Sequence, residues 1–161
     1  MFETQNDLPN KTRKPVVELL NARLADAIDL GAQCKQAHWN VKGPNFIALH
    51  ELFDKVAESV EDHIDELAER ITSLGGTACG TIASAAKNTS LKPYPEDIYD
   101  GEAHLKALSA ALADFGKKVR KAIDKTGSLG DADTADLFTG ISREVDKYLW
   151  FLEAHLYSTK R

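Results

Sequence analysis

The stretch from Pro44 to Gly76, PNFIALHELFDKVAESVEDHIDELAERITSLGG, decides the fold of this chain. Its apolar residues recur at steps of three and four, which predicts one face of a single α-helix. Pro44 suits the first turn of such a helix, and the pair Gly75-Gly76 ends it. The helix would run for about 30 residues, or roughly 45 Å. Its apolar seam consists of Phe46, Leu49, Phe53, Val56, Val60, Ile64, Leu67, Ile71 and Leu74.

Three further segments show the same helical spacing. The first helix is predicted from Pro15 to about Asn40, because proline suits a first turn and apolar residues recur after it. Another helix opens at Pro95 and ends at the break TGSLGD of residues 126–131. The last helix begins at about Asp131.

Residues 76–94 separate the second and third predicted helices. This stretch is rich in Gly, Ser, Thr and Ala and is too long for a tight turn, so it predicts a crossover with one short helix. Strand signals are absent. Four helices with one long crossover indicate an all-α fold, a ferritin-like four-helix bundle. We expect an N-terminal tail over residues 1–14, the bundle over residues 15–158 and a short C-terminal tail over residues 159–161.

The composition is that of a single globular domain and excludes several other classes. No run of about 18 apolar residues exists, so we expect no membrane span. The opening MFETQNDLPN lacks the basic patch and the apolar stretch of a secretory signal. Cys34 and Cys79 form no CxxC motif, which favours reduced thiols and a cytoplasmic location. The net charge of −5 argues against a DNA-binding surface spread over the whole body.

Two pairs of metal-ligating side chains lie within the predicted second helix. His50 and Asp54 are four residues apart, as are Asp65 and Glu69, so each pair stacks on one face of the helix. All four fall within an arc of about 100° on a helical wheel. Asp54 and Asp65, however, are separated by roughly 16 Å of helical rise. Because metal–ligand bonds are about 2 Å long, one chain cannot close a site around both pairs.

An antiparallel copy of the same helix would bring the two pairs together. The residue numbers of His50 and Glu69 have the same sum as those of Asp54 and Asp65. A two-fold axis near Ser59–Val60 therefore places each pair of one chain beside the other pair of its partner. Such a dimer has two identical sites by symmetry. Each site would hold His38, His50 and Asp54 from one chain and Asp65 and Glu69 from the other.

A simpler interpretation of these residues stays open at this point. Asp65 and Glu69 could be a solvated face, as charged residues on helices usually are, and His38 could be a hydrogen-bonded core histidine. Two imidazoles with three carboxylates suit Fe(II), Mn(II) or Zn(II) and do not select one of them. A structural zinc or manganese site is therefore one of the alternatives.

Four stretches carry a resemblance to a known family. KQAHWNVKGPNFIALHELFD (residues 35–54) and DELAERITSLGG (residues 65–76) resemble the Dps family, the mini-ferritins or DNA-binding proteins from starved cells. DADTADLF (residues 131–138) and WFLEAHL (residues 150–156) extend the resemblance over almost the whole chain. The resemblance implies a hollow homo-dodecamer built from two-fold dimers. It also implies a ferroxidase that oxidises Fe(II), preferably with hydrogen peroxide, and stores ferric oxyhydroxide, which spares DNA from oxidative damage.

The resemblance implies roles for single residues as well. The family's ferroxidase centre lies at the two-fold interface and has two iron positions. The tryptophan beside it, matched here by Trp39, accepts stray oxidising equivalents, although Trp39 could instead be a buried packing residue. Carboxylates would hold and bridge the iron, and imidazoles would complete its shell. The residues at the family's ligand positions are His38, His50, Asp54, Asp65 and Glu69.

Acidic residues open the predicted fourth helix at Asp131, Asp133 and Asp136. In the Dps family, acids of this segment line three-fold pores through which Fe(II) enters, which implies this role for Asp131 and Asp136 above all. Three copies of such carboxylates would focus a negative potential on the pore. Acids in a first turn also complement the helix dipole, and Asp131 could be the N-cap.

Binding to DNA is predicted to be weak and salt-sensitive, or absent. Some Dps proteins bind DNA through a Lys/Arg-rich tail, but residues 1–14 hold only one more positive than negative side chain. A shell of twelve such chains would carry a charge of about −60 and repel phosphate. The alternative function is a nucleoid-associated protein that shields DNA by binding it, with a structural metal site. The basic residues near the chain ends are Lys11, Arg13, Lys14, Lys160 and Arg161.

Three histidines and both cysteines receive no functional role from the sequence. His63 lies two residues before Asp65 and could support the metal ligands from behind, but it is expected at the surface; His104 and His155 have no clear task. Cys34 continues the apolar side of the first helix, so it is predicted to be a core residue. Cys79 lies in the crossover and is predicted to be exposed and open to oxidation.

Overall fold

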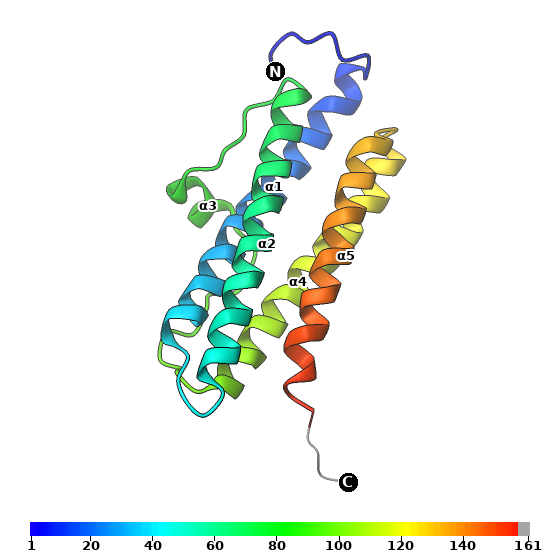
Figure 1. Cartoon of the computed structure of the whole chain (residues 1–161). Helices are drawn as coiled ribbons and strands as arrows, with labels where there is room; N and C mark the ends of the chain where they lie inside the picture. The colour runs from blue at the N-terminus through cyan, green and yellow to red at the C-terminus, as the bar shows by residue number, and fades with distance from the viewer. Residues whose placement is uncertain (158–161) are drawn as a thin grey trace.

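The computed structural model describes residues 1–157 and contains five α-helices within them, as the helical spacing of the sequence indicates (Figure 1). No strand occurs within these residues, where Lys42 and Asp100 form only an isolated bridge. No helix among them is long and apolar enough to cross a membrane. The helices are α1 (Asn10–Asn40), α2 (Phe46–Ser73), α3 (Ile82–Asn88), α4 (Gly101–Ser128) and α5 (Ala132–Ala154).

Two helical hairpins form the bundle. α1 packs along α2 and α4 packs along α5, while contacts of α1 with α4 and of α2 with α5 join the two hairpins (Figure 1). Their apolar faces meet in one core, in which Phe53 of α2, Phe115 of α4 and Phe138 of α5 are fully buried. This arrangement confirms the predicted all-α four-helix bundle with a long crossover between its second and third long helices.

The crossover between α2 and α4 packs against α1 and carries α3, so the predicted short helix is confirmed (Figure 1). Asp26 of α1 is fully buried and accepts hydrogen bonds from the backbone N–H and the hydroxyl of Ser90 at 2.7 and 2.9 Å. Arg23 pairs with the same carboxylate at 2.8 Å. Thr89 donates a further bond of 2.7 Å to Asp29. These polar contacts fasten the crossover to α1 and fix its path toward α4.

α1 begins at Asn10, five residues before the predicted start at Pro15, so that prediction is wrong. Residues 10–14, which the sequence assigns to the N-terminal tail, are helical. Arg13 accounts for the difference. Its side chain is buried and donates hydrogen bonds to the carbonyl of Leu74 at 3.0 Å and to the side chain of Asn10 at 2.7 Å. These contacts stabilise the first turns, although Pro15 removes one helical N–H.

α4 begins at Gly101 rather than at Pro95, so the predicted start of the third long helix is also wrong. Pro95 disfavours helical geometry in the residue before it, and the chain stays non-helical as far as Asp100. Asp100 is the N-cap, and its carboxylate accepts a hydrogen bond of 2.9 Å from the Ala103 N–H. The helix then continues to Ser128, inside the predicted break.

The remaining boundaries agree more closely with the sequence. α2 begins two residues after Pro44 and ends shortly before Gly75, whose φ of 79° favours glycine. α5 begins directly after Asp131 and ends at Ala154. The predicted end of the bundle at residue 158 and the C-terminal tail of residues 159–161 lie outside the described residues.

Candidate metal centre

His38 in the last turn of α1 and His50 near the start of α2 face each other across the turn between these helices. Nδ1 of His38 lies 2.8 Å from the backbone oxygen of His50, and Nδ1 of His50 lies 2.8 Å from that of His38. The two rings stack with their centroids 3.7 Å apart. A carbonyl oxygen only accepts, so in the neutral rings both Nδ1 atoms donate and both Nε2 atoms carry a lone pair. Metal-binding imidazoles are oriented in this way by their second nitrogen.

Asp54 follows His50 by one turn of α2 and is the third predicted ligand on this side. Its Oδ1 lies 3.9 Å from Nδ1 of His38. The same carboxylate pairs with Nζ of Lys35, which lies one turn before His38 on α1. The hydrogen bond from Lys35 is the main reason why the pKa of Asp54 lies below its ordinary value, and it outweighs the opposing effect of partial burial. Asp54 is therefore an anion that a lysine of the same chain neutralises.

Asp65 and Glu69 lie further along α2, and both are exposed. α2 is uninterrupted from Phe46 to Ser73, so helical rise places Asp65 roughly 16 Å beyond Asp54. Within residues 1–157, no group of three or more His, Cys, Asp or Glu side chains is placed to hold a metal ion. One chain therefore carries the predicted ligands as two separate groups, one at the α1–α2 turn and one near the other end of α2.

Large apolar side chains near the histidines in sequence are exposed, without cover from the rest of the described chain. Trp39 is 68% exposed and Ile47 is 60% exposed. The ring of Phe46, also exposed, lies 5.0 Å from that of His50. The packing interpretation requires a buried Trp39, but Trp39 is not buried within its own chain. Exposed apolar groups gathered in one place mark a surface for interaction with another molecule.

Asp131 is the N-cap of α5 and is only 1% exposed. Its carboxylate accepts hydrogen bonds from the backbone N–H of Thr134 at 3.0 Å and from the Thr134 hydroxyl at 2.6 Å. It also pairs with Arg70 of α2 at 2.8 Å. This burial argues against the predicted pore role of Asp131. Asp133 and Asp136 are exposed and line a groove of about 470 Å³, so the pore role stays a prediction for them.

The predicted burial of Cys34 and exposure of Cys79 are confirmed, the oxidation of Cys79 stays a prediction, and the prediction for one histidine is wrong. Cys34 is buried in the core, and burial raises the pKa of its thiol to about 12. Cys79 is exposed. His63 is buried rather than at the surface: it lines the groove between α2 and α5 that Asp133 and Asp136 also line, with Nδ1 3.2 Å from the carboxylate of Glu66. His155 is exposed at the end of α5.

Sequence reasoning misses Lys35 and the pair formed by Tyr94 and His104. A signal for Lys35 is available, because it precedes His38 by three residues and so shares its face of α1. The Tyr94 hydroxyl lies 2.7 Å from Nδ1 of His104, which is buried. No spacing rule reveals this contact, because Tyr94 lies in the non-helical segment before α4.

Comparison with known proteins adds three findings. A family model described as a ferritin-like domain matches residues 17–161. The DNA protection during starvation protein of Agrobacterium fabrum strain C58 is 49% identical over 154 residues, which cover 96% of this chain and 95% of that protein. Two solved structures are similar in fold. Dps of Mycobacterium smegmatis in its tetragonal form has a TM-score of 0.91 at 37% identity, with 97% of this chain and 95% of that chain covered.

The second structure is a Dps protein from Vibrio cholerae O1. It is described as a member of a broad superfamily of ferritin-like diiron-carboxylate proteins. Its TM-score is 0.90 at 27% identity, and 98% of each chain is covered. Both the bundle and the order of its helices are therefore shared with proteins of this kind.

Proposed function

Because the chain belongs to the Dps family of ferritin-like proteins, we propose that it is a ferroxidase that stores iron and thereby protects DNA from oxidative damage. Fe(II) is its substrate and ferric oxyhydroxide its cargo. The observation that carries this proposal is the reciprocal bonding of His38 and His50 through their Nδ1 atoms, which leaves both Nε2 atoms free as ligands, with the Asp54 carboxylate 3.9 Å from Nδ1 of His38.

A second subunit completes the site in this proposal. Asp65 and Glu69 are exposed on the same uninterrupted helix as Asp54, and a two-fold axis near Ser59–Val60 brings them to the histidine pair of the partner. The exposed Trp39 supports an interface at this place. Each site would hold two irons between two imidazoles and three carboxylates. Two-fold dimers of this kind would assemble further into the hollow homo-dodecamer of the family, with Asp136 at its pores.

The proposed reaction keeps hydroxyl radical from forming. Two Fe(II) ions each give up one electron, and hydrogen peroxide takes both electrons and two protons to become two molecules of water. Carboxylates stabilise the resulting Fe(III), which is a harder cation than Fe(II). Hydrolysis of Fe(III) gives the ferric oxyhydroxide that the shell stores. A two-electron reaction at a paired site therefore consumes both of the substances that damage DNA.

The charges near the N-terminus favour this chemistry over physical shielding of DNA. With Arg13 buried, the exposed charged side chains of residues 1–14 balance: two are basic and two are acidic. Nothing in this segment offsets the net charge of −5 of the whole chain. Phosphate contacts of lysine and arginine supply most of the affinity in non-specific DNA binding. We therefore propose that the protein protects DNA without holding it tightly.

A plasmid assay tests the proposed function. Supercoiled plasmid is exposed to Fe(II) and hydrogen peroxide with the wild-type protein, with the His38→Ala/His50→Ala variant, or with albumin at equal mass. We expect the wild type to prevent nicking, the variant to protect no better than albumin, and neither to retard the plasmid in a gel at physiological salt. Equal protection by the variant, together with retardation, would contradict the proposal and favour the DNA-shielding alternative.

Lys35 offers a test of the metal-binding half of the site, since its ammonium competes with any cation for Asp54. In the Lys35→Met variant we expect the pKa of Asp54 to rise toward its ordinary value. We also expect anaerobic Fe(II) binding to tighten by up to about fivefold, because exposed ion pairs are worth about 1 kcal/mol or less. Isothermal titration calorimetry under nitrogen measures the affinity. Lys55→Met is the matched control, because Lys55 is an exposed lysine beside Asp54 in sequence; equal effects of both variants would contradict the competition.

A further inference from the structure

Tyr94 and His104 form a hydrogen-bonded pair away from the predicted metal ligands. The Tyr94 hydroxyl lies 2.7 Å from Nδ1 of His104, and the two rings stack at an angle of 15° with centroids 6.0 Å apart. His104 is 1% exposed in α4, while Tyr94 is partly buried in the segment before that helix. Nε2 of His104 makes no hydrogen bond of normal length within residues 1–157. Tyr94 thus makes the one hydrogen bond of normal length to this imidazole within these residues, and the backbone of Ile98 also acts on it.

Both members of the pair are neutral near physiological pH. Burial raises the pKa of Tyr94 above its ordinary value, and the neighbouring Cys34 adds to this effect. Burial lowers the pKa of His104, against smaller opposing effects of Asp100 and of the Ile98 backbone. The imidazole therefore has a lone pair with which it can accept the hydrogen of a neutral phenol. The phenol, in turn, cannot lose its proton to water in advance of any reaction.

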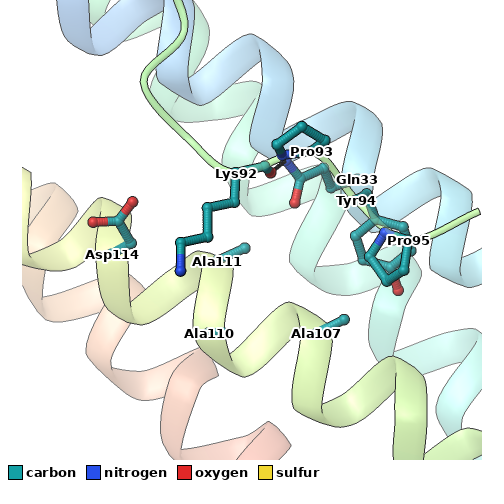
Figure 2. A pocket seen from close by; sticks show the side chains of 9 residues that line it. All are labelled: Gln33, Lys92, Pro93, Tyr94, Pro95, Ala107, Ala110, Ala111 and Asp114. Atoms are coloured by element: carbon teal, nitrogen blue, oxygen red, sulfur yellow. Dashed lines mark hydrogen bonds between the residues drawn. The ribbon is translucent and has the colours of Figure 1, made fainter.

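An aromatic ring next to the pair belongs to the chain neighbour of a proposed ligand. Phe53 is fully buried in α2 beside Asp54, and its ring centroid lies 6.2 Å from that of His104. Tyr94, the other member of the pair, lines a cavity of about 420 Å³ between the crossover and α4 (Figure 2). Figure 2 shows the tyrosine between Pro93 and Pro95 on one wall, with alanines of α4 on the facing wall. His104 is therefore flanked by Tyr94, which lines a water-accessible cavity, and by Phe53, the sequence neighbour of the proposed ligand Asp54.

We propose that Tyr94, with His104 as its proton acceptor, is a redox-active site that takes up single oxidising equivalents from the metal centre. The inference rests on the proposed function for its oxidant. Where only one Fe(II) is present, peroxide receives one electron and leaves hydroxide and a hydroxyl radical. Tyr94 supplies the missing electron, which reduces this radical to a second hydroxide. At the same time the O–H bond of Tyr94 breaks, and its proton moves to Nδ1 of His104, which leaves a neutral tyrosyl radical and an imidazolium.

Geometry favours this transfer over direct loss of an electron. An oxidised phenol is a far stronger acid than imidazolium, so the proton leaves as soon as the electron does. A base already hydrogen-bonded to the reacting hydroxyl avoids the slow step of finding an acceptor, an advantage of positioned bases in general. The exposed Tyr99 of the same segment has no hydrogen bond through its hydroxyl within residues 1–157. It is therefore a natural comparison for Tyr94.

An iron-free oxidant tests the pair separately from the ferroxidase. The chain has four tyrosines, so changing three of them to phenylalanine leaves either Tyr94 alone or Tyr99 alone. Each full-length variant is oxidised with photogenerated ruthenium(III) tris-bipyridyl, freeze-quenched and examined by electron paramagnetic resonance. We expect a tyrosyl radical that forms on the order of 100-fold faster at Tyr94 than at Tyr99, as a positioned base allows. Adding His104→Gln to the Tyr94-only variant should remove this advantage and the accompanying deuterium isotope effect.

The same variants are then treated with peroxide and less than one Fe(II) per site. A radical at Tyr94 in both experiments supports the inference. It is overturned if ruthenium produces no faster oxidation at Tyr94, or if iron is oxidised normally and Tyr94 gives no radical. If the wild type does not oxidise iron at all, the proposed function fails instead, and the ruthenium experiment alone decides whether the pair is redox-active. Circular dichroism of the His104→Gln variant shows whether a lost signal reflects lost folding.

Discussion

Replacing both Asp65 and Glu69 with alanine is expected to reduce peroxide-driven Fe(II) oxidation to the rate in buffer. Both side chains are exposed and lie roughly 16 Å or more along α2 from Asp54, so a site within one chain would not need them. In the shared site they are two of five ligands. Loss of groups that merely support metal ligands costs about 10–100-fold in activity, so loss of two ligands should cost at least about 100-fold.

The measurement is the initial rise of ferric absorbance after peroxide is added to anaerobically loaded protein. Glu102→Ala/Glu153→Ala is the matched control, because it removes two exposed carboxylates that lie outside α2, on α4 and α5. We expect the control to oxidise iron nearly as fast as the wild type. Equal losses in the two variants would mean that the protein attracts iron by its overall charge and that Asp65 and Glu69 are not ligands.

Replacing Asp131 with alanine is expected to cost about 3 kcal/mol of unfolding free energy. The change leaves Arg70 without its buried anion. The N–H and the hydroxyl of Thr134 also lose the carboxylate to which both donate hydrogen bonds. Removal of one partner from a buried ion pair costs about 3–5 kcal/mol. We expect the lower end of this range because Arg70 retains some contact with water. Loss of the N-cap contributes about 1 kcal/mol of the total.

Urea unfolding followed by circular dichroism at matched protein concentration measures this loss. Asp131→Asn separates the two contributions, because asparagine caps helices about as well as aspartate but carries no charge. Asp133→Ala is the control. Asp133 is exposed and its carboxylate lies as far as 4.0 Å from Arg70, so this ion pair is weak. Removal of Asp133 should therefore change the unfolding free energy by no more than about 0.5 kcal/mol. If the Asp131 and Asp133 variants unfolded alike, Asp131 would have no capping role, and its place at a pore would regain support.

Helical periodicity is sufficient to predict the bundle, because four amphipathic segments have few other ways to bury their apolar faces. It predicts the crossover as well, since residues 76–94 contain no long apolar repeat. Helix ends are less predictable. Asn10 begins α1 because Arg13 bonds Leu74, a contact between residues far apart in the chain that no local pattern encodes. Pro95 resembles a helix start, but the helix starts only at the Asp100 cap.

The relative positions of side chains on one helix can be predicted from the sequence, whereas contacts between side chains of different segments cannot. The separation of Asp54 from Asp65 follows from helical rise alone, because α2 is continuous. The reciprocal bonds of His38 and His50 depend on how the α1–α2 turn closes, which spacing does not determine. Tyr94 meets His104 only because polar contacts of α1 hold the crossover in place. Such contacts between segments determine which histidine nitrogen holds the proton and which group accepts a proton, and reactivity depends on both.

Mixed assemblies test the sharing of the site most directly. One subunit carries His50→Ala/Asp54→Ala and the other carries Asp65→Ala/Glu69→Ala, so neither forms a complete site with its own kind. In a two-fold dimer of unlike subunits, one of the two sites has all of its ligands and the other has lost both groups. Equimolar co-expression should therefore restore roughly one quarter of the wild-type rate of iron oxidation, from two inactive parents. A mixture that stays as inactive as its parents, in assemblies shown to contain both subunits, would contradict a site built from two chains.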